Sequence, residues 1–293
     1  MQQLKSRKRR FGDRYDGYKV KESDPLFYVI PHIMRSRLDS QVFFREQIEI
    51  TQIREFVQKY RKEIPNLSLY HVFIAAVLRT MAQKPRLNRF VSGRKIYARN
   101  YLRVSLAIKK GMNENAPESL VMPEFEPTDT LYDVAQKFNE EIEKTKTEQE
   151  TNGTEFTVKL LNILPGFMTK FVVWVIRNLD AIGKMPKIIH RVSPFHSSFF
   201  VTNVGSIGLN SIYHHLYEFG TTSVFLAIGK KEVVRVLDSD GNVIDKNVIN
   251  LSFVLDERIC DGFYYASAIK NVKRLLKKPE LLLEPPEYIS EDY

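Results

Sequence analysis

The chain has 293 residues and a formal net charge of +9 at pH 7, and 43% of its residues are hydrophobic. This length and hydrophobic content suffice for a packed core, which excludes a chain that is disordered as a whole. The single cysteine excludes an internal disulfide, and no apolar signal segment follows the basic start. We therefore expect a cytoplasmic protein.

Charge distinguishes the two ends of the chain. Basic residues are spread over most of the sequence, with one cluster at Lys5, Arg7, Lys8, Arg9 and Arg10. We interpret residues 1–24 as a basic, flexible arm in solvent, and we expect no binding to nucleic acid. Residues 284–293 have acidic side chains and no basic one, which predicts an acidic, frayed tail. The folded domain then spans residues 25–283.

Helix and strand periodicities alternate irregularly along the first half of the domain. Every second residue is mostly apolar over 42–50, which predicts a strand, and Thr51 then caps a helix. A second helix is predicted over 69–81 and ends before Pro85. Residues 102–108 alternate as a half-buried strand.

The second half of the domain is richer in strands. Thr130 and Asp133 form a capping box at the start of a helix that reaches Ile142. Strands are then predicted at 199–204, 223–229 and 233–237 and in a run that ends at Leu255. A last helix covers 264–275. This order predicts an α+β fold with a mixed β-sheet flanked by helices.

One segment is more apolar than its neighbours. On a helix, Phe167 to Ile182 is apolar nearly all round, although Lys170 and Arg177 interrupt it. These cations leave no apolar stretch near the roughly 20 residues that a membrane span requires. We expect an apolar helical insertion at about 160–190 that packs in the core or at a subunit interface. Contact with a membrane surface, with Trp174 near the headgroups, is the less favoured alternative.

Six segments in the same order resemble the catalytic domain of dihydrolipoyl acyltransferases and chloramphenicol acetyltransferase. They are residues 47–56, 72–88, 101–110, 199–205, 220–229 and 256–262. The signature of these proteins is a histidine, three residues, an aspartate and a glycine. Residues 257–262 match it, except that Glu257 stands in the histidine position. The resemblance implies one domain with a chloramphenicol acetyltransferase-like two-layer fold.

The resemblance also implies a reaction. In this family the histidine is the general base for the thiol of coenzyme A or of a dihydrolipoyl arm, and the thiolate attacks an acyl group. A hydroxyl on a neighbouring strand stabilises the oxyanion, and by position this is Thr202. Asn203, Gly205 and Ser206 would contact the substrate.

The family assembles as trimers with active sites between subunits. The resemblance thus implies a homotrimer or a multiple of three. Coenzyme A or a lipoyl group would be a co-substrate and not a permanently bound cofactor. The roughly 25 residues ahead of the domain cannot form a lipoyl domain. A lipoyl group would therefore come from an acyl-carrying partner protein in trans.

Glu257 changes the chemistry of the signature. An unperturbed histidine pKa of about 6.5 lies roughly two units below that of a thiol, whereas the pKa of glutamate, about 4.3, lies about four below. The additional gap is about 3 kcal/mol. Burial could raise the glutamate pKa, and Arg258 would lower it if it faced the carboxylate. The competing interpretation is an ion pair in a site that no longer catalyses thiol attack.

The other polar residues near the signature have simpler interpretations. Asp261 is expected to fix the loop geometry, and Gly262 to permit a backbone conformation or approach that a side chain would prevent. His215, or its neighbour His214, is an alternative base, although a surface or packing role is favoured. Cys260 is not expected to act as a nucleophile. No metal-ligand spacing occurs, and no glycine-rich nucleotide loop is present.

Two hypotheses follow from these residues. The first is an acyltransferase-family protein that binds an acyl thioester, with thiol-directed transfer weak or lost. The second is a non-catalytic assembly or binding module that retains the trimeric fold. Whether the chain is an enzyme is left open by the sequence, because Glu257 can be explained in both ways.

Overall fold

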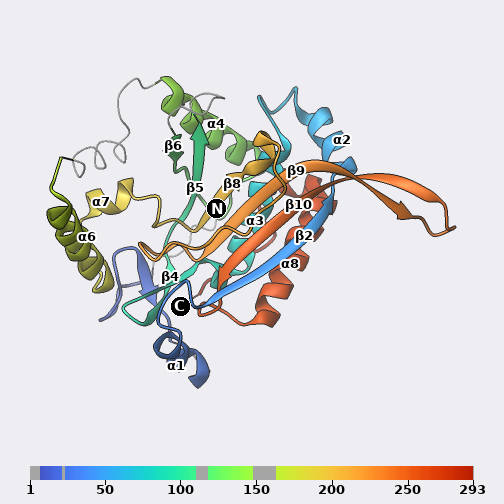
Figure 1. The fold of residues 1–293 in the computed structure, drawn as a ribbon. Helices are drawn as coiled ribbons and strands as arrows, with labels where there is room; N and C mark the ends of the chain where they lie inside the picture. The colour runs from blue at the N-terminus through green and yellow to red at the C-terminus, as the bar shows by residue number, and fades with distance from the viewer. Residues whose placement is uncertain (1–6, 22–23, 110–117, 148–162, 293) are drawn as a thin grey trace.

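The structure is a computed structural model that describes residues 7–21, 24–109, 118–147 and 163–292. Its main sheet has the strand order β2-β10-β9-β8-β5-β6, and β7 pairs with β5 (Figure 1). The strands are β2 (Gln41–Glu49), β5 (Leu102–Lys109), β6 (Glu118–Val121), β7 (Glu124–Phe125), β8 (Phe199–Asn203), β9 (Val224–Leu237) and β10 (Val243–Asp256). β8 is parallel to both β5 and β9, and the other pairs are antiparallel. The sheet is therefore mixed.

Helices form the second layer of the fold. The helices are α1 (Pro25–Ile33), α2 (Thr51–Tyr60), α3 (Leu69–Gln83), α4 (Leu131–Thr147), α6 (Gly166–Ala181), α7 (Lys187–Val192) and α8 (Gly262–Lys277). Short 3₁₀ turns are η1 (Pro85–Asn88), η2 (Val204–Ile207) and η3 (Pro279–Leu282). The main core lies between the sheet and α2, α3, α4 and α8. A smaller sheet joins β1 (Gly17–Lys19), β4 (Lys95–Arg99) and β3 (Arg89–Ser92).

Side chains of β8 illustrate why the sheet has two distinct faces. Successive residues of a strand point to opposite sides. Phe199 and Val201 enter the main core under the helices, whereas Phe200 packs with Phe225 in a smaller cluster on the other face. Thr202, two residues after Phe200, therefore also faces away from the helix layer.

The start of the helices is only partly as predicted. Thr130 and Asp133 form the expected capping box, with the Thr130 N–H donating to Asp133 at 2.8 Å. The cap at Thr51 is wrong, because Thr51 is already helical and Ile50 precedes it without a side-chain cap. Ser68 and His71 form an unpredicted capping box at α3, in which a histidine ring takes the place of the usual glutamate or glutamine.

Both ends of the chain pack more closely than the sequence predicts. Within the expected arm, Arg14 and Asp16 are buried, and β1 adds to the smaller sheet. Within the expected tail, Asp292 pairs with Arg89 at 2.5 Å, and the Ser290 N–H donates to the Ala82 carbonyl at 3.0 Å. These ion pairs and hydrogen bonds hold segments whose composition alone suggests solvent exposure.

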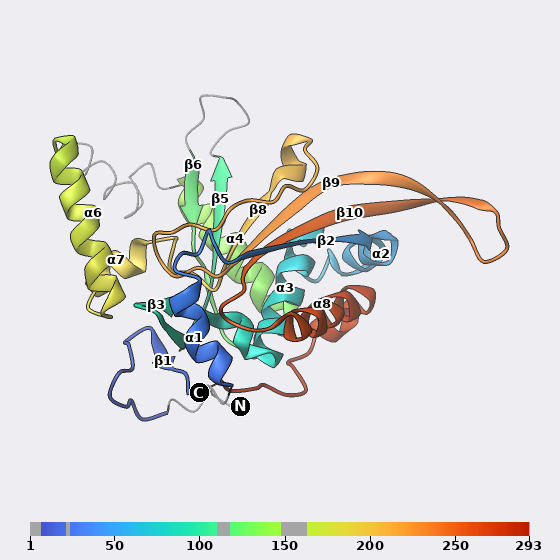
Figure 2. The same ribbon diagram turned by 60° about the horizontal axis from the view of Figure 1, so that its bottom comes forward.

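The insertion is helical, but it lies on the surface. α6 stands at the edge of the molecule, beyond α7 (Figure 2). Phe167, Phe171 and Trp174 are 74%, 63% and 60% exposed, and Asp180 is the one buried residue of the helix. Packing of this segment in the core of the chain was therefore a wrong expectation. The helices of the described residues include none that is long and apolar enough to cross a membrane.

A long hairpin extends from the main sheet. β10 pairs with β2 only from Val248 onward, so its first residues pair with β9 alone. Figures 1 and 2 show this two-stranded ribbon projecting well past the body of the protein. It exposes Val233, Leu237 and Val243 at 60%, 69% and 67%. Two-stranded ribbons without a covering layer are marginally stable in water.

Candidate functional site

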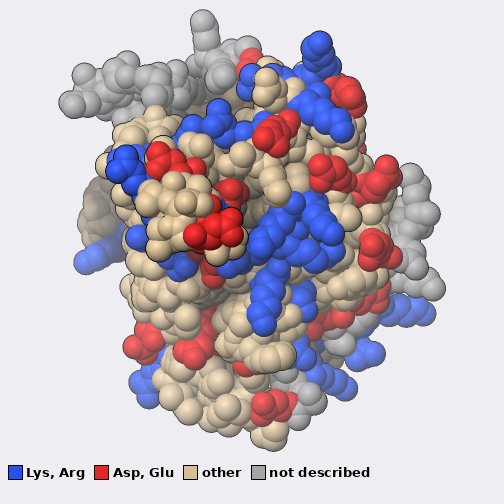
Figure 3. All heavy atoms as spheres, turned by 90° about the vertical axis from the view of Figure 1, so that its right-hand side faces the viewer, with Lys and Arg blue, Asp and Glu red and all other residues tan. Residues whose placement is uncertain are grey.

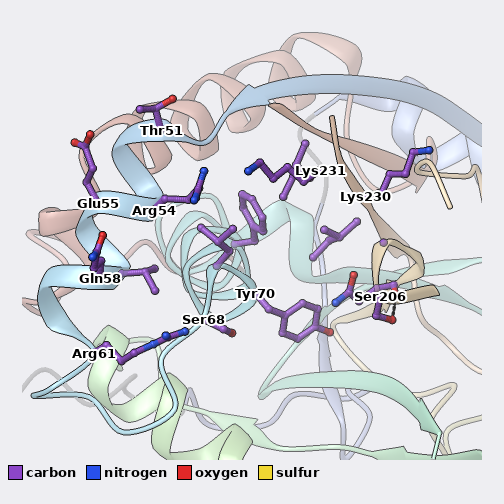
Figure 4. Close-up of a pocket in the computed structure, with 18 residues that line it drawn as sticks. Thr51, Arg54, Glu55, Gln58, Arg61, Ser68, Tyr70, Ser206, Lys230 and Lys231 are labelled. Carbon is purple, nitrogen blue, oxygen red and sulfur yellow. Dashed lines mark hydrogen bonds between the residues drawn. The ribbon is translucent and has the colours of Figure 1, made fainter. Parts of the chain in front are cut away.

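A pocket of about 870 Å³ opens between α2, the start of α3 and the end of β8 (Figure 4). Three residues that the resemblance predicts to contact the substrate line it, namely Asn203, Gly205 and Ser206. The turn η2 positions them directly after the last residue of β8. Tertiary structure thus places this strand end opposite two helices that lie more than a hundred residues earlier in the chain.

Basic side chains dominate the charge of this pocket. Arg54 comes from α2, Arg61 directly follows that helix, and Lys230 and Lys231 come from β9. Glu55 is the single acidic residue among the described residues of the wall. Figure 4 shows Arg54 and Lys231 pointing toward one another across the opening, with Lys230 turned away. Residue spacing in the sequence does not reveal these cations as a group, because they become neighbours only when α2 packs beside the β8–β9 end of the sheet.

Tyr70 adds a polar group to the pocket wall. Its hydroxyl oxygen is buried and has no hydrogen-bond partner among the described residues. Burial raises the pKa of Tyr70 well above its usual value, so the hydroxyl remains a donor at neutral pH. Figure 4 shows this hydroxyl directed toward the side of the pocket that carries Ser206. An unpaired buried hydroxyl costs free energy unless a ligand or water pairs with it.

Two glycines allow the turn after β8 to lie against β9. A β-carbon at Gly205 would collide with the carbonyl oxygen of Gly229, and one at Gly229 would lie 2.5 Å from the backbone nitrogen of Ser211. This close approach brings η2 to the pocket. Ser206 donates its hydroxyl to the Asn203 carbonyl at 2.7 Å, which closes the turn.

Thr202 and Glu257 do not meet within one chain. Thr202 is in register with Ala227 of β9, which is in register with Ser252 of β10. Glu257 follows five residues later, which is about 17 Å along the strand. Its side chain is exposed, and it forms no ion pair with the described residues. A site that combines these two residues would therefore need a second chain.

Arg258 faces the residue before Glu257. Its guanidinium binds the Asp256 carboxylate with nitrogen–oxygen distances of 2.7 and 2.8 Å, and both side chains are buried. Arg37 approaches the same carboxylate at 3.6 Å, and Ser40 donates its hydroxyl at 3.0 Å. Arg258 is therefore occupied by Asp256 and is turned from Glu257. The Asp256–Arg37 contact was missed because it joins positions about 220 residues apart.

The remaining signature residues are structural within the chain. Asp261 caps α8 by accepting the Tyr264 N–H at 2.8 Å. The expectation for Gly262 is wrong within this chain, because it is the first residue of α8 and a β-carbon there would meet no atom within 4 Å. Burial raises the pKa of Cys260 to about 12, which keeps the thiol protonated and unreactive at neutral pH.

The two adjacent histidines have different environments. The His214 ring stacks on Phe225, with ring centroids 4.1 Å apart. Burial lowers the pKa of His214, so its ring is neutral at pH 7. His215, the sequence-predicted alternative base, is exposed. His214 lies over the face of the sheet to which Thr202 points, which makes it the better placed of the pair.

Part of the sequence matches a known family. Residues 193–284 match the model of the 2-oxoacid dehydrogenases acyltransferase (catalytic domain) family. The matched part contains β8, β9, β10 and the altered signature. This matched part has the acyltransferase fold. No curated protein sequence matches the chain.

Solved structures extend this likeness over most of the chain. The cubic core of the pyruvate dehydrogenase multienzyme complex has a TM-score of 0.55 at 14% identity, covering 91% of this chain and 95% of that one. A dihydrolipoamide acetyltransferase of Azotobacter vinelandii has a TM-score of 0.57 at 14% identity, covering 91% and 95%. A chloramphenicol acetyltransferase has a TM-score of 0.52 at 10% identity, covering 87% and 96%. The predicted acyltransferase fold is thereby confirmed.

Proposed function

We propose that the chain binds coenzyme A thioesters in the pocket between α2, α3 and β8, and that thiol acyl transfer is weak or absent in the native protein. The observation that carries this proposal is the pair of cations Arg54 and Lys231, which face one another across the pocket next to Asn203, Gly205 and Ser206. Coenzyme A carries a pyrophosphate and a 3′-phosphate, whose charges Arg54 and Lys231 can pair. The Tyr70 hydroxyl can donate a hydrogen bond to the same ligand.

The charge of the pocket favours coenzyme A over a lipoyl arm. A lipoyl group is uncharged along its length, and it would leave the cations of the wall without partners. Coenzyme A also fits the position of the pocket, because its thiol could reach the end of β8 while its phosphates remain near α2. An acyl-carrying protein in trans is thus the less favoured donor.

We expect the double change Arg54→Ala with Lys231→Ala to weaken coenzyme A binding by at least about tenfold, because each removes a charge-assisted hydrogen bond. Isothermal titration calorimetry of the full chain with coenzyme A measures the dissociation constant. Arg235→Ala is the matched control, since Arg235 is 80% exposed by side chain on the projecting hairpin. Unchanged affinity in the double variant, or no binding to the native chain at millimolar coenzyme A, would contradict the proposal.

We interpret Thr202, Glu257 and Asp261 as the remains of the family's reaction centre. The Azotobacter vinelandii study concerns a serine, a histidine and an asparagine in the catalytic mechanism, the last two being four positions apart. Glu257 and Asp261 have the same spacing. Glu257 forms no ion pair with the described residues, so the ion pair expected for a non-catalytic site is not formed within one chain. What favours the second candidate function, a binding or assembly module without turnover, is the exposure of Glu257, because the pKa of glutamate stays low without burial.

We expect the chain to form a trimer or a multiple of three. The projecting hairpin exposes Val233, Leu237 and Val243, which another chain could cover. The cubic core among the similar structures supports this number, because a cube has a three-fold axis at each corner. Sedimentation equilibrium measures the mass. A stable monomer of 34.2 kDa at micromolar concentration would refute this assembly and any site between subunits.

A further inference from the structure

The outward face of α6 combines aromatic and basic side chains. Phe167, Phe171 and Trp174 are spaced i, i+4 and i+7, so they share one side of the helix, and this side is exposed. The rings of Phe171 and Trp174 lie 6.1 Å apart in a stacked arrangement. Lys170 and Arg177 flank the aromatic residues on the same outward face. We call these five residues the α6 face.

Surface charge around the α6 face is mainly positive. From 163 to 191 the only acidic residue is Asp180, which is buried and pairs with Arg14 at 2.6 Å. The exposed charges of this segment are Lys170, Arg177, Lys184, Lys187 and Arg191. Exposed Ile163, Ile182 and Ile188 lie along the same segment. Within residues 163–191 all exposed charges are positive, and Glu218, whose side chain is 31% exposed, lies beside Arg177 at 3.7 Å. An apolar surface with this excess of cations complements an anionic partner.

An arginine-lined hollow continues from this face. Arg177 also borders a pocket of about 120 Å³. Four further arginines border it, namely Arg35, Arg37, Arg94 and Arg258. The buried Nε of Arg37, on a side chain that is 4% exposed, makes no hydrogen bond with the described residues, although it lies 3.6 Å from the Asp256 carboxylate. This hollow could accept a phosphate group.

The acidic residues beside this hollow already have partners. Asp180 is held by Arg14 and by His196 at 3.4 Å. Glu218 accepts the backbone N–H groups of Arg37 and Leu38. Of these two acidic residues, Glu218 is the one that contacts Arg177, with a nitrogen–oxygen distance of 3.7 Å. Asp256 holds Arg258 at 2.7 Å and lies 3.6 Å from Arg37, so the uncompensated charge of the hollow comes from Arg35 and Arg94, which form no ion pair with the described residues.

We propose that the α6 face and the adjoining arginine hollow bind the surface of an anionic membrane. The aromatic side chains would enter the headgroup region, and the arginines would contact lipid phosphates. A second copy of the chain is a poorer partner. Its acidic groove, lined by Glu124, Glu126, Glu291 and Asp292, is partly neutralised, because Arg103 pairs with Glu124 and Arg89 pairs with Asp292. Its two larger described grooves are basic. One is the pocket beside α2, and another carries Lys270, Lys273 and Lys277 of α8. Figure 3 shows Lys and Arg gathered on the side of the molecule that carries the hairpin.

Trp174 is the only tryptophan, so intrinsic tryptophan fluorescence reports on this helix alone. We expect a blue shift of its emission, and co-sedimentation of the full chain, with phosphatidylglycerol vesicles but not with phosphatidylcholine vesicles. Phe171→Ser should reduce both signals. Lys170→Ala and Arg177→Ala should each weaken binding about fivefold. Tyr288→Ser, at an exposed aromatic position near the end of the chain, is the control and should bind as the native chain does.

Several results would overturn the proposal. Emission and sedimentation that do not change with phosphatidylglycerol vesicles would refute it. So would binding that Phe171→Ser and the two cation variants leave intact. A blue-shifted emission that exists without vesicles and reverts on dilution would instead assign the α6 face to a contact between copies. Circular dichroism of each variant separates these outcomes from loss of folding.

Discussion

Replacing Arg14 with alanine should lower the free energy of unfolding by about 3 to 5 kcal/mol, because it leaves two buried carboxylates without their cation. The guanidinium binds Asp16 at 2.7 Å and Asp180 at 2.6 Å, and it donates to the Ser92 hydroxyl at 2.8 Å. This one side chain joins the N-terminal segment, the smaller sheet and α6. Urea unfolding followed by circular dichroism measures the loss.

The pH dependence of this loss distinguishes a charge effect from a packing effect. Burial alone would raise the pKa of Asp16 and of Asp180, but hydrogen bonds to Arg14, His190 and His196 outweigh it and lower both values. Their contribution is present above the unfolded pKa of about 3.9 and is lost as the pH falls through the lowered values. Without Arg14, only the contacts with His190 and His196 oppose the effect of burial, so we expect the pKa of both groups to rise and protonation to relieve part of the penalty.

The difference between Arg14→Ala and the native chain should therefore shrink from pH 7 to about pH 4.5. A difference that stays constant over this range would assign the loss to packing on Phe90 and Tyr97, which lie 5.2 and 5.5 Å from the guanidinium. Arg235→Ala removes an exposed ion pair and should change stability by less than about 1 kcal/mol.

Replacing Glu257 with histidine should raise the rate of thiol acylation by about 10²-fold over the native chain. The reason is the gap of about 3 kcal/mol in proton-transfer driving force between an unperturbed glutamate and an unperturbed histidine. The exposed position of Glu257 in the single chain leaves room for the imidazole. Thiol release from acetyl-coenzyme A in the presence of dihydrolipoamide measures the rate.

Two further variants test where the base lies. Glu257→Gln should leave the native rate near the uncatalysed value, and Thr202→Ala in the Glu257→His background should remove the gain. A native chain that is already fast, and that loses its activity on His214→Ala but not on Glu257→Gln, would move the base to His214. An inactive Glu257→His trimer that still binds coenzyme A would support the non-catalytic module.

Local patterns in the sequence were sufficient for the elements of the fold. The alternation over 42–50 predicted β2, because one face of this strand lies under helices. The alternation over 102–108 predicted the strand β5, but the expectation that it is half-buried was wrong, because both faces are buried from Leu102 to Leu106. The capping box of Thr130 and Asp133 predicted the start of α4, since both partners lie within one turn. The altered signature, a strand followed by a helix, likewise identified β10 and α8.

Contacts between distant parts of the chain determine which residues come together at the candidate site. The sequence alone determined an α+β acyltransferase fold, a glutamate in place of its histidine, and Asn203, Gly205 and Ser206 beside the strand end. Only the tertiary structure placed Arg54 opposite Lys231, turned Arg258 toward Asp256, and left Phe171 and Trp174 in solvent. The physical reason is that burial and charge pairing depend on which elements pack together, and residue spacing along one element does not contain that information.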